Sequence, residues 1–228
     1  MSDFLTTFKE SLLILLFEFL GTLLLTALWN SCWYAGFDHV GLLCGFFILL
    51  IFSARISGSH FNPAVTLSFM FRKDVSGGSG RFSRVLGLLY IAAQYAGAIL
   101  GGIMSYNLFQ ANPDAFTSDL PDWLSNLIPD IPYGEPMSVQ YGGEDGDTLL
   151  LIQAILLEIL GAMIITFLYL TQTEEHTKMS PDPAITTLII AATYTAVVGI
   201  SESPAISVTS GSPFNPAAAA GIGAAITF

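Results

Sequence analysis

Five long apolar runs alternate with polar connections along the chain. The runs cover residues 11–29, 40–52, 85–108, 149–170 and 184–200. A membrane helix needs about 20 predominantly apolar residues, and the second run approaches this length only when its flanks are counted. Five such runs would leave a soluble domain almost no polar surface. The pattern therefore predicts an all-α membrane protein with five spanning helices.

Two further apolar segments are too short to cross a bilayer, and each begins at an Asn-Pro-Ala tripeptide. Asn is a favoured helix N-cap, and Pro fits the first helical position because its missing N–H has no partner there. We therefore expect half-helices from Pro63 to about Phe71 and from Pro216 to about Ile226. The tripeptides are Asn62-Pro63-Ala64 and Asn215-Pro216-Ala217.

The two tripeptides belong to an internal duplication. Each follows a Gly-Ser-x-Phe stretch, and each lies downstream of an apolar run that carries one acid, Glu18 or Glu158. Duplication on this scale within 228 residues indicates an inverted-repeat architecture. We accordingly divide the single domain, 1–228, into a first repeat (11–108), an acidic loop (109–147) and a second repeat (148–228).

At membrane depth, the two half-helices define a candidate path for solutes. Non-helical backbone inside a bilayer is tolerated where it packs in protein or lines a water-filled cavity. Half-helices that enter from opposite sides would meet near the midplane and direct two positive dipole ends, each of about +0.5 charge, at one point. Such a centre repels cations, while Asn amides can donate hydrogen bonds to a neutral solute. The predicted chemistry is selection of neutral solutes, with no bond made or broken.

The charges are strongly segregated along the chain, whose net charge is −11. Five of the seven basic residues lie in 53–84, whereas 110–147 contains eight acids and no Lys or Arg. Basic residues near spans favour the cytosolic or matrix-like side. We therefore predict that the N-terminus, 53–84 and 171–183 lie on that side and the acidic loop on the other. The acidic loop is expected to hold a short helix at about 122–127, and to be either a solvated loop or a docking surface.

This orientation can be tested with single cysteines at Arg81 and Asp130, in a chain whose native cysteines are replaced by Ser. A membrane-impermeant thiol reagent added to one face should label only one of the two positions, because they are predicted on opposite sides. Labelling of both positions from the same face would contradict the predicted topology.

Nothing in the sequence resembles an enzyme active site. We find no nucleotide-binding loop, no nucleophile–base arrangement and no metal-ligand spacing, and Cys32 and Cys44 form no wider pattern. The prediction is a non-enzymatic protein without cofactor or metal and without a nucleic-acid partner.

The duplicated motifs, the paired acids and Ala-Gln-Tyr-Ala-Gly-Ala at 93–98 resemble the aquaporins, the major intrinsic protein family. The resemblance extends from about Leu13 to the end. It implies six spans and two half-helices around one narrow pore per subunit, usually in a tetramer. By this resemblance, the pore centre comprises Asn62, Pro63, Ala64, Asn215, Pro216 and Ala217, and the loop anchors are Glu18, Glu158, His60 and Gln94.

Two features depart from the family pattern. The residue after the second tripeptide is typically Arg in the family and is Ala218 here, and ungapped alignment places Leu42, Ser203 and Ser212 at the other outer constriction positions. A filter of these uncharged residues should be wider than a strict water filter. The sequence also has no apolar run after the second half-helix. We therefore expect five spans, with a helix from another subunit or a bound lipid in place of a sixth.

Three classes of function stay open at this point. The intact tripeptides favour a passive channel for water or small neutral solutes such as glycerol. The two departures and the acidic loop favour a non-conducting structural subunit of a larger membrane complex. A secondary carrier with inverted repeats is the least supported, because no pair of ionisable groups lines the middle. The expected partners are membrane lipid and either further copies of the chain or a larger complex, and the organelle is not indicated.

Overall fold

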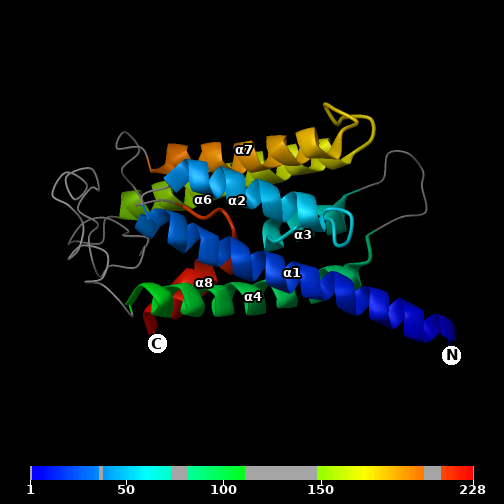
Figure 1. Cartoon of the computed structure of the whole chain (residues 1–228). Helices are drawn as coiled ribbons and strands as arrows, with labels where there is room; N and C mark the ends of the chain where they lie inside the picture. Colours follow the sequence, from blue (N-terminus) through cyan, green and yellow to red (C-terminus); the bar gives the residue numbers. More distant parts are fainter. Residues whose placement is uncertain (1, 36–37, 73–81, 111–147, 203–211, 228) are drawn as a thin grey trace, which may run out of the picture.

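The computed structural model describes residues 2–35, 38–72, 82–110, 148–202 and 212–227. These residues form seven helices and, within the described ranges, no strand. Figure 1 shows a bundle of long helices, with the half-helices α3 and α8 lying toward opposite ends of it. The helices are α1 (Ser2–Ala35), α2 (Asp38–Ser53), α3 (Pro63–Phe71), α4 (Arg84–Gln110), α6 (Thr148–Thr173), α7 (Pro183–Ser201) and α8 (Pro216–Thr227).

The predicted spans and half-helices are all present as helices. Four of them, α1, α4, α6 and α7, are long and apolar enough to cross a membrane. The 16-residue α2 is about 24 Å long at 1.5 Å per residue, shorter than a hydrocarbon core of about 30 Å. Helix α1 extends well beyond its apolar run because residues 2–10 contain no Gly or Pro that would break it. The short helix predicted at about 122–127 lies outside the described residues.

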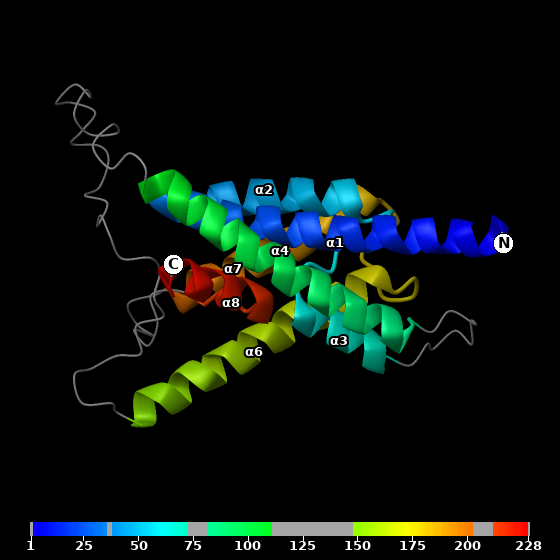
Figure 2. The same ribbon diagram turned by 90° about the horizontal axis from the view of Figure 1, so that it is seen from below.

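Contacts in the first half of the chain are repeated in the second. Helix α1 packs on α2 as α6 packs on α7, and α1 contacts α8 as α6 contacts α3. Each half-helix is therefore held by the long first helix of the opposite half. Figure 2 shows α8 and α3 lying one after the other along α4 when the bundle is seen from below.

Glycines allow α1 and α4 to approach closely. A Cβ atom added at Gly97 would lie 2.2 Å from the backbone oxygen of Phe19, and one at Gly101 would lie 2.3 Å from that of Leu23. The Gly-x-x-x-Gly spacing puts both glycines on one face of α4, where small residues let backbones touch. The two helices form the most extensive pairing among the described elements.

The core lies between α1, α2 and α7 and reaches the loops before both half-helices. The ring of Tyr194 packs edge-on against Trp29 at 6.1 Å and tilted against Phe46 at 4.9 Å between ring centroids. Phe61 and Phe214, one before each half-helix, belong to the same cluster. Many apolar side chains on the outer faces of the long helices are exposed, as a lipid environment requires.

Candidate functional site

Asn62 and Asn215 each cap the half-helix that follows. The Asn62 Oδ1 atom accepts a hydrogen bond of 2.8 Å from the backbone N–H of Ala64, and Pro63 occupies the first turn of α3. The Asn215 Oδ1 atom accepts bonds of 3.1 and 3.3 Å from the N–H groups of Ala217 and Ala218. Because each side-chain oxygen faces a helix N-terminus, the orientation of each amide is fixed.

The amide nitrogens of the two caps cross between the halves of the chain. Asn62 Nδ2 donates to the carbonyl oxygen of Phe214 at 2.9 Å, and Asn215 Nδ2 donates to that of Phe61 at 2.8 Å. These bonds place the two tripeptides side by side, although they lie far apart in sequence. An amide nitrogen carries two hydrogens, and among the described contacts each of these uses one for the opposite carbonyl. Among these contacts, the second N–H of each Asn forms no hydrogen bond.

Phe61 and Phe214 adopt left-handed backbone conformations. Their φ values are +48° and +46°, in a region that non-glycine residues rarely occupy. Each such residue costs about 1–3 kcal/mol and persists only where the surroundings enforce it. The crossed Asn bonds and the burial of both rings provide that enforcement. The Phe before each tripeptide is visible in the sequence, but nothing there indicates its backbone conformation.

A glycine in each first span accommodates the Phe ring. A Cβ atom added at Gly21 would lie 2.0 Å from the ring of Phe61, and one at Gly161 would lie 2.2 Å from the ring of Phe214. Each glycine lies three residues after the acid of its run. The duplicated acid–glycine spacing was therefore the sequence signal for this contact, which sequence reasoning missed.

Glu18 binds the loop that precedes α3. Its Oε1 atom accepts a 3.0 Å bond from the backbone N–H of His60, and its Oε2 atom accepts bonds of 2.8 Å from Phe61 N–H and from Gln94 Nε2. Gln94 also donates to Thr66 Oγ1 at 2.9 Å. The fully buried carboxylate therefore joins α1, the loop and α4 through three hydrogen bonds.

Glu158 is held less firmly than Glu18. It is half-buried and lies next to the Ser212 hydroxyl and the Phe214 backbone N–H. The Ser212 Oγ atom nevertheless forms no hydrogen bond of normal geometry. Pro213 occupies the position that corresponds to His60 and, having no N–H, cannot donate to the carboxylate. The two acids, although equivalent in the duplication, therefore have different surroundings.

His60 is enclosed by aromatic rings. Its ring stacks on Phe69 at 4.4 Å between centroids, and Tyr90 and Tyr169 lie edge-on at 5.3 and 6.1 Å. Its Nδ1 atom lies 3.2 Å from Thr66 Oγ1. The side chain thus fixes the loop to the first turn of α3.

Two tyrosine hydroxyls also secure this loop. Tyr90 donates to the carbonyl oxygen of Ser57, and Tyr169 donates to that of Ser59, both at 2.7 Å. Sequence reasoning did not find either tyrosine, because a single Tyr in an apolar run carries no signal of its partner.

The proposed outer constriction is only partly described. Leu42, Ser212 and Ala218 are buried, and Leu42 belongs to the apolar core cluster. Ser203 lies outside the described residues. The role of these positions in a constriction stays a prediction.

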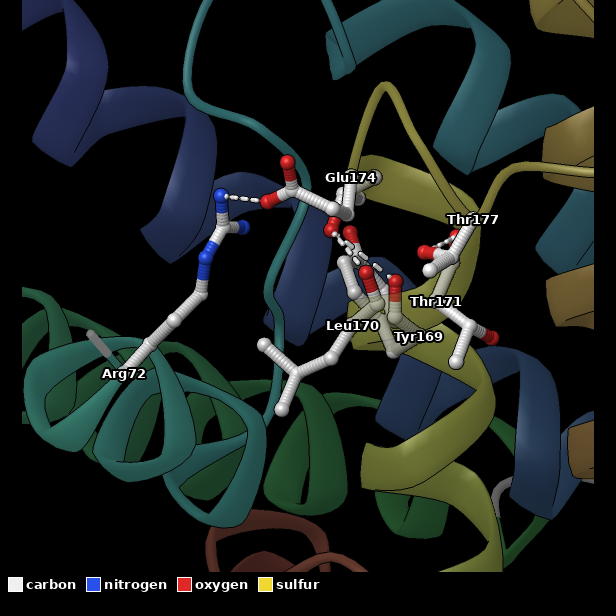
Figure 3. A network of polar contacts seen from close by, with 7 residues as sticks. Arg72, Tyr169, Leu170, Thr171, Glu174 and Thr177 are labelled. Atoms are coloured by element: carbon white, nitrogen blue, oxygen red, sulfur yellow. Dashed lines mark hydrogen bonds and ion pairs between the residues drawn. The ribbon is translucent and has the colours of Figure 1, made fainter. Parts of the chain in front are cut away.

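An ion pair ties the end of the first half-helix to the α6–α7 connection. Arg72, at the C-cap of α3, binds Glu174, which follows α6 (Figure 3). Its guanidinium lies 5.7 Å from the ring centroid of Phe69. Thr177 Oγ1 donates to the carbonyl oxygen of Thr171 at 2.8 Å and stabilises the connection itself. The contact places Arg72 and this connection at the same end of the bundle, as the charge pattern requires.

The helical bundle with paired, Asn-capped half-helices is that of an integral, multi-pass membrane protein. The chain matches the model of the family described as "Major intrinsic protein" over residues 2–227. It therefore belongs to the major intrinsic protein family, whose members are channels and not enzymes.

Curated relatives and a solved structure agree with this assignment. The chain is 30% identical to a "Probable glycerol uptake facilitator protein" from Thermotoga maritima over 171 residues, which cover 67% of this chain and 61% of that protein. It is 37% identical to "Putative aquaporin NIP4-1" from Arabidopsis thaliana over 75 residues, which cover 32% of this chain and 24% of the relative. The chain thus spans about a quarter of the length of the plant relatives it matches.

The fold is also that of a known crystal structure. The aquaglyceroporin from Plasmodium falciparum superposes with a TM-score of 0.57 at 20% identity, over 96% of this chain and 83% of that one. The predicted aquaporin-like fold is confirmed.

Proposed function

We propose that this protein is a passive channel for water and small neutral solutes, with glycerol as the representative solute. The observation that carries the proposal is the pair of amide groups at Asn62 and Asn215, each with one N–H left for a solute. The positive ends of two half-helix dipoles meet at the same point and disfavour cations. A neutral molecule with hydroxyl groups can accept both hydrogen bonds as it passes.

Two further observations support a solute larger than water. The predicted outer constriction carries uncharged residues, with Ala218 in the position where the family typically has Arg. Relatives from Thermotoga maritima and Buchnera aphidicola are named as glycerol uptake facilitators, at 30% and 31% identity. The comparisons give no support to the non-conducting structural subunit, and we do not propose it.

The assembly and orientation of the channel belong to the same proposal. Family members typically form oligomers in lipid, and we expect several copies of this chain to associate. The N-terminus and the α6–α7 connection are proposed to face the cytosolic or matrix-like side, in line with the basic residues of 53–84. The boundaries of the two repeats stay a prediction.

Asn62→Asp should reduce solute flux about tenfold or more. The flux is measured in liposomes reconstituted with the purified protein and any chains that copurify with it. Aspartate keeps the oxygen that caps α3 but lacks both amide hydrogens, so the donor to the solute is lost, which is worth about 1.4 kcal/mol or more. Stopped-flow light scattering after a glycerol or sucrose gradient measures the flux.

Asn107→Asp is the matched control, because Asn107 lies exposed near the end of α4 and its amide bonds only its own helix, at the Ile103 carbonyl. It should conduct like the unaltered chain. If the folded and assembled protein gives water and glycerol fluxes no higher than those of empty liposomes, the proposal of a channel is refuted.

A further inference from the structure

A histidine and a carboxylate face each other where α2 begins and α7 ends. The two helices pack on each other, and Figure 1 shows the start of α2 and the end of α7 at the same end of the bundle. The His39 Nε2 atom lies 3.0 Å from the Oε2 atom of Glu202, which is the C-cap of α7. The two side chains are 43% and 15% exposed. The pair therefore lies at the margin of the bundle and not in its core.

Gly199 provides the space that the imidazole ring occupies. A Cβ atom added at Gly199 would lie 2.9 Å from His39 Nε2, so a larger residue there would displace the ring. Gly199 precedes Glu202 by three residues, which is about one helical turn. The ring of His39 thus lies against the last turn of α7, next to the carboxylate that ends this turn.

The contact between the two groups depends on charge. His39 Nε2 is buried and forms no hydrogen bond of normal geometry, although Glu202 Oε2 lies within 3.0 Å. A neutral imidazole gains little from a poorly directed contact. A protonated imidazole, in contrast, is attracted to a carboxylate at this distance whatever the angle. Because the charge of histidine ordinarily changes between pH 5 and 8, the link between α2 and α7 should be stronger in acid.

Glu202 is the one charged group that a neighbouring helix presents to His39 within the described residues. Helix α2 packs on α1 and α7. Residues 19–35 of α1 include no Asp, Glu, Lys, Arg or His, and the Cys and Tyr side chains among them are ordinarily neutral below pH 8. Residues 183–201 of α7 include no charged residue either, and on α2 itself Asp38 precedes His39. The attraction between α2 and α7 at this point is thus governed by the proton on His39.

The residue next to Glu202 holds the second re-entrant loop. The Ser201 Oγ atom accepts a 3.0 Å hydrogen bond from the backbone N–H of Ser212, and both residues are fully buried. Ser212 lies three residues before Asn215, the N-cap of α8. Since Ser201 and Glu202 belong to the same turn, a movement at the end of α7 is passed to Ser212 and from there toward the Asn215 amide.

We propose that His39 is a positioning residue for transport. When protonated, it binds Glu202, holds the last turn of α7 against α2, and keeps Ser212 and Asn215 in the arrangement that conducts. The proposal rests on the proposed channel function and adds a condition for it. The charged pair is present below the pH at which His39 loses its proton and is lost above it, so flux should fall as the pH rises.

The first test measures glycerol flux in liposomes at pH 6 and pH 8, with the same pH on both faces. Flux through the unaltered chain should be about twofold to fivefold higher at pH 6, the range that a partly exposed ion pair supports. His39→Gln and Glu202→Gln, which remove either charge, should give the lower flux at both pH values. His39→Arg, permanently charged, should keep the higher flux at both.

His176→Gln is the matched control, because His176 lies exposed in the connection between α6 and α7, away from α2. This variant should keep the full pH dependence of the unaltered chain. Equal flux at the two pH values in the unaltered chain, or the same pH dependence in the His39 and Glu202 variants, would overturn the proposal.

A second measurement does not require flux. Hydrogen–deuterium exchange at the Ser212 N–H reports the bond to Ser201 directly. At pH 6, exchange should be about twofold to fivefold faster in His39→Gln than in the unaltered chain, and at pH 8 the two should agree. Equal exchange at pH 6 overturns the positioning role, even beside normal glycerol flux. The expected difference in exchange without any flux would instead contradict the channel and leave the link from His39 to the loop in place.

Discussion

Glu18→Ala is expected to destabilise the folded chain by about 3 kcal/mol or more, because it leaves three buried donors without an acceptor. These donors are the N–H groups of His60 and Phe61 and the side-chain amide of Gln94. Each stranded donor costs about 1–3 kcal/mol. The loop before α3 also loses its link to α1. Tryptophan fluorescence during denaturant unfolding in detergent measures the change in free energy.

Glu158→Ala is the matched control at the equivalent position of the second half. Its carboxylate is half-buried, and the neighbouring Ser212 hydroxyl does not bond to it. We therefore expect a loss of about 1 kcal/mol, from at most one stranded backbone donor. Equal losses in the free energy of unfolding would show that the different surroundings of the two acids do not change their contributions to stability.

Gly221→Ala should have the second large effect, whereas Gly223→Ala in the same half-helix should have almost none. A Cβ atom at Gly221 would lie 2.2 Å from the backbone oxygen of Ala98, and backbone cannot move aside as a flexible side chain can. Overpacking of this kind costs about 1–3 kcal/mol and more where the backbone must shift. The contact joins α8 to α4, so the half-helix that carries Asn215 should be displaced.

At Gly223 an added Cβ atom meets nothing within 4 Å. Alanine there should stabilise the helix slightly, by about 0.5–1 kcal/mol, because it reduces the freedom of the unfolded chain. Thermal unfolding and glycerol flux measured on both variants separate the two effects. A Gly221→Ala protein as stable and as conductive as the Gly223→Ala protein would contradict the close approach of α4 and α8.

The sequence predicted the elements whose cause is local. Asn followed by Pro fixes where a helix can begin, and α3 and α8 begin at Pro63 and Pro216. In the same way, the lengths of the apolar runs predicted the long helices. The Gly-x-x-x-Gly spacing in 97–101 is a further local feature that fits the close packing of α4 on α1, since both residues fall on one helix face.

Features that depend on distant partners could not be predicted in this way. The hydroxyl bonds from Tyr90 to Ser57 and from Tyr169 to Ser59 join segments that only the folded bundle brings together. The difference between the two acids did have a signal, since Pro213 stands where the first repeat has His60. The duplication suggested that the two acids have equal roles. Because Pro213 has no backbone N–H, the second acid has one hydrogen-bond donor fewer than the first.

The crossed bonds of Asn62 and Asn215 have a consequence for how the protein is made. The Asn62 amide bonds a carbonyl 152 residues further along the chain, which at about 5–20 residues per second is synthesised roughly 8–30 s later. Until then, Phe61 lacks the Asn215 bond that helps enforce its strained backbone. The first half-helix can therefore reach its final position only after the second has entered the membrane. We expect the inserted first half to resemble an open intermediate, protease-sensitive at its re-entrant loop, until translation of the second half is complete.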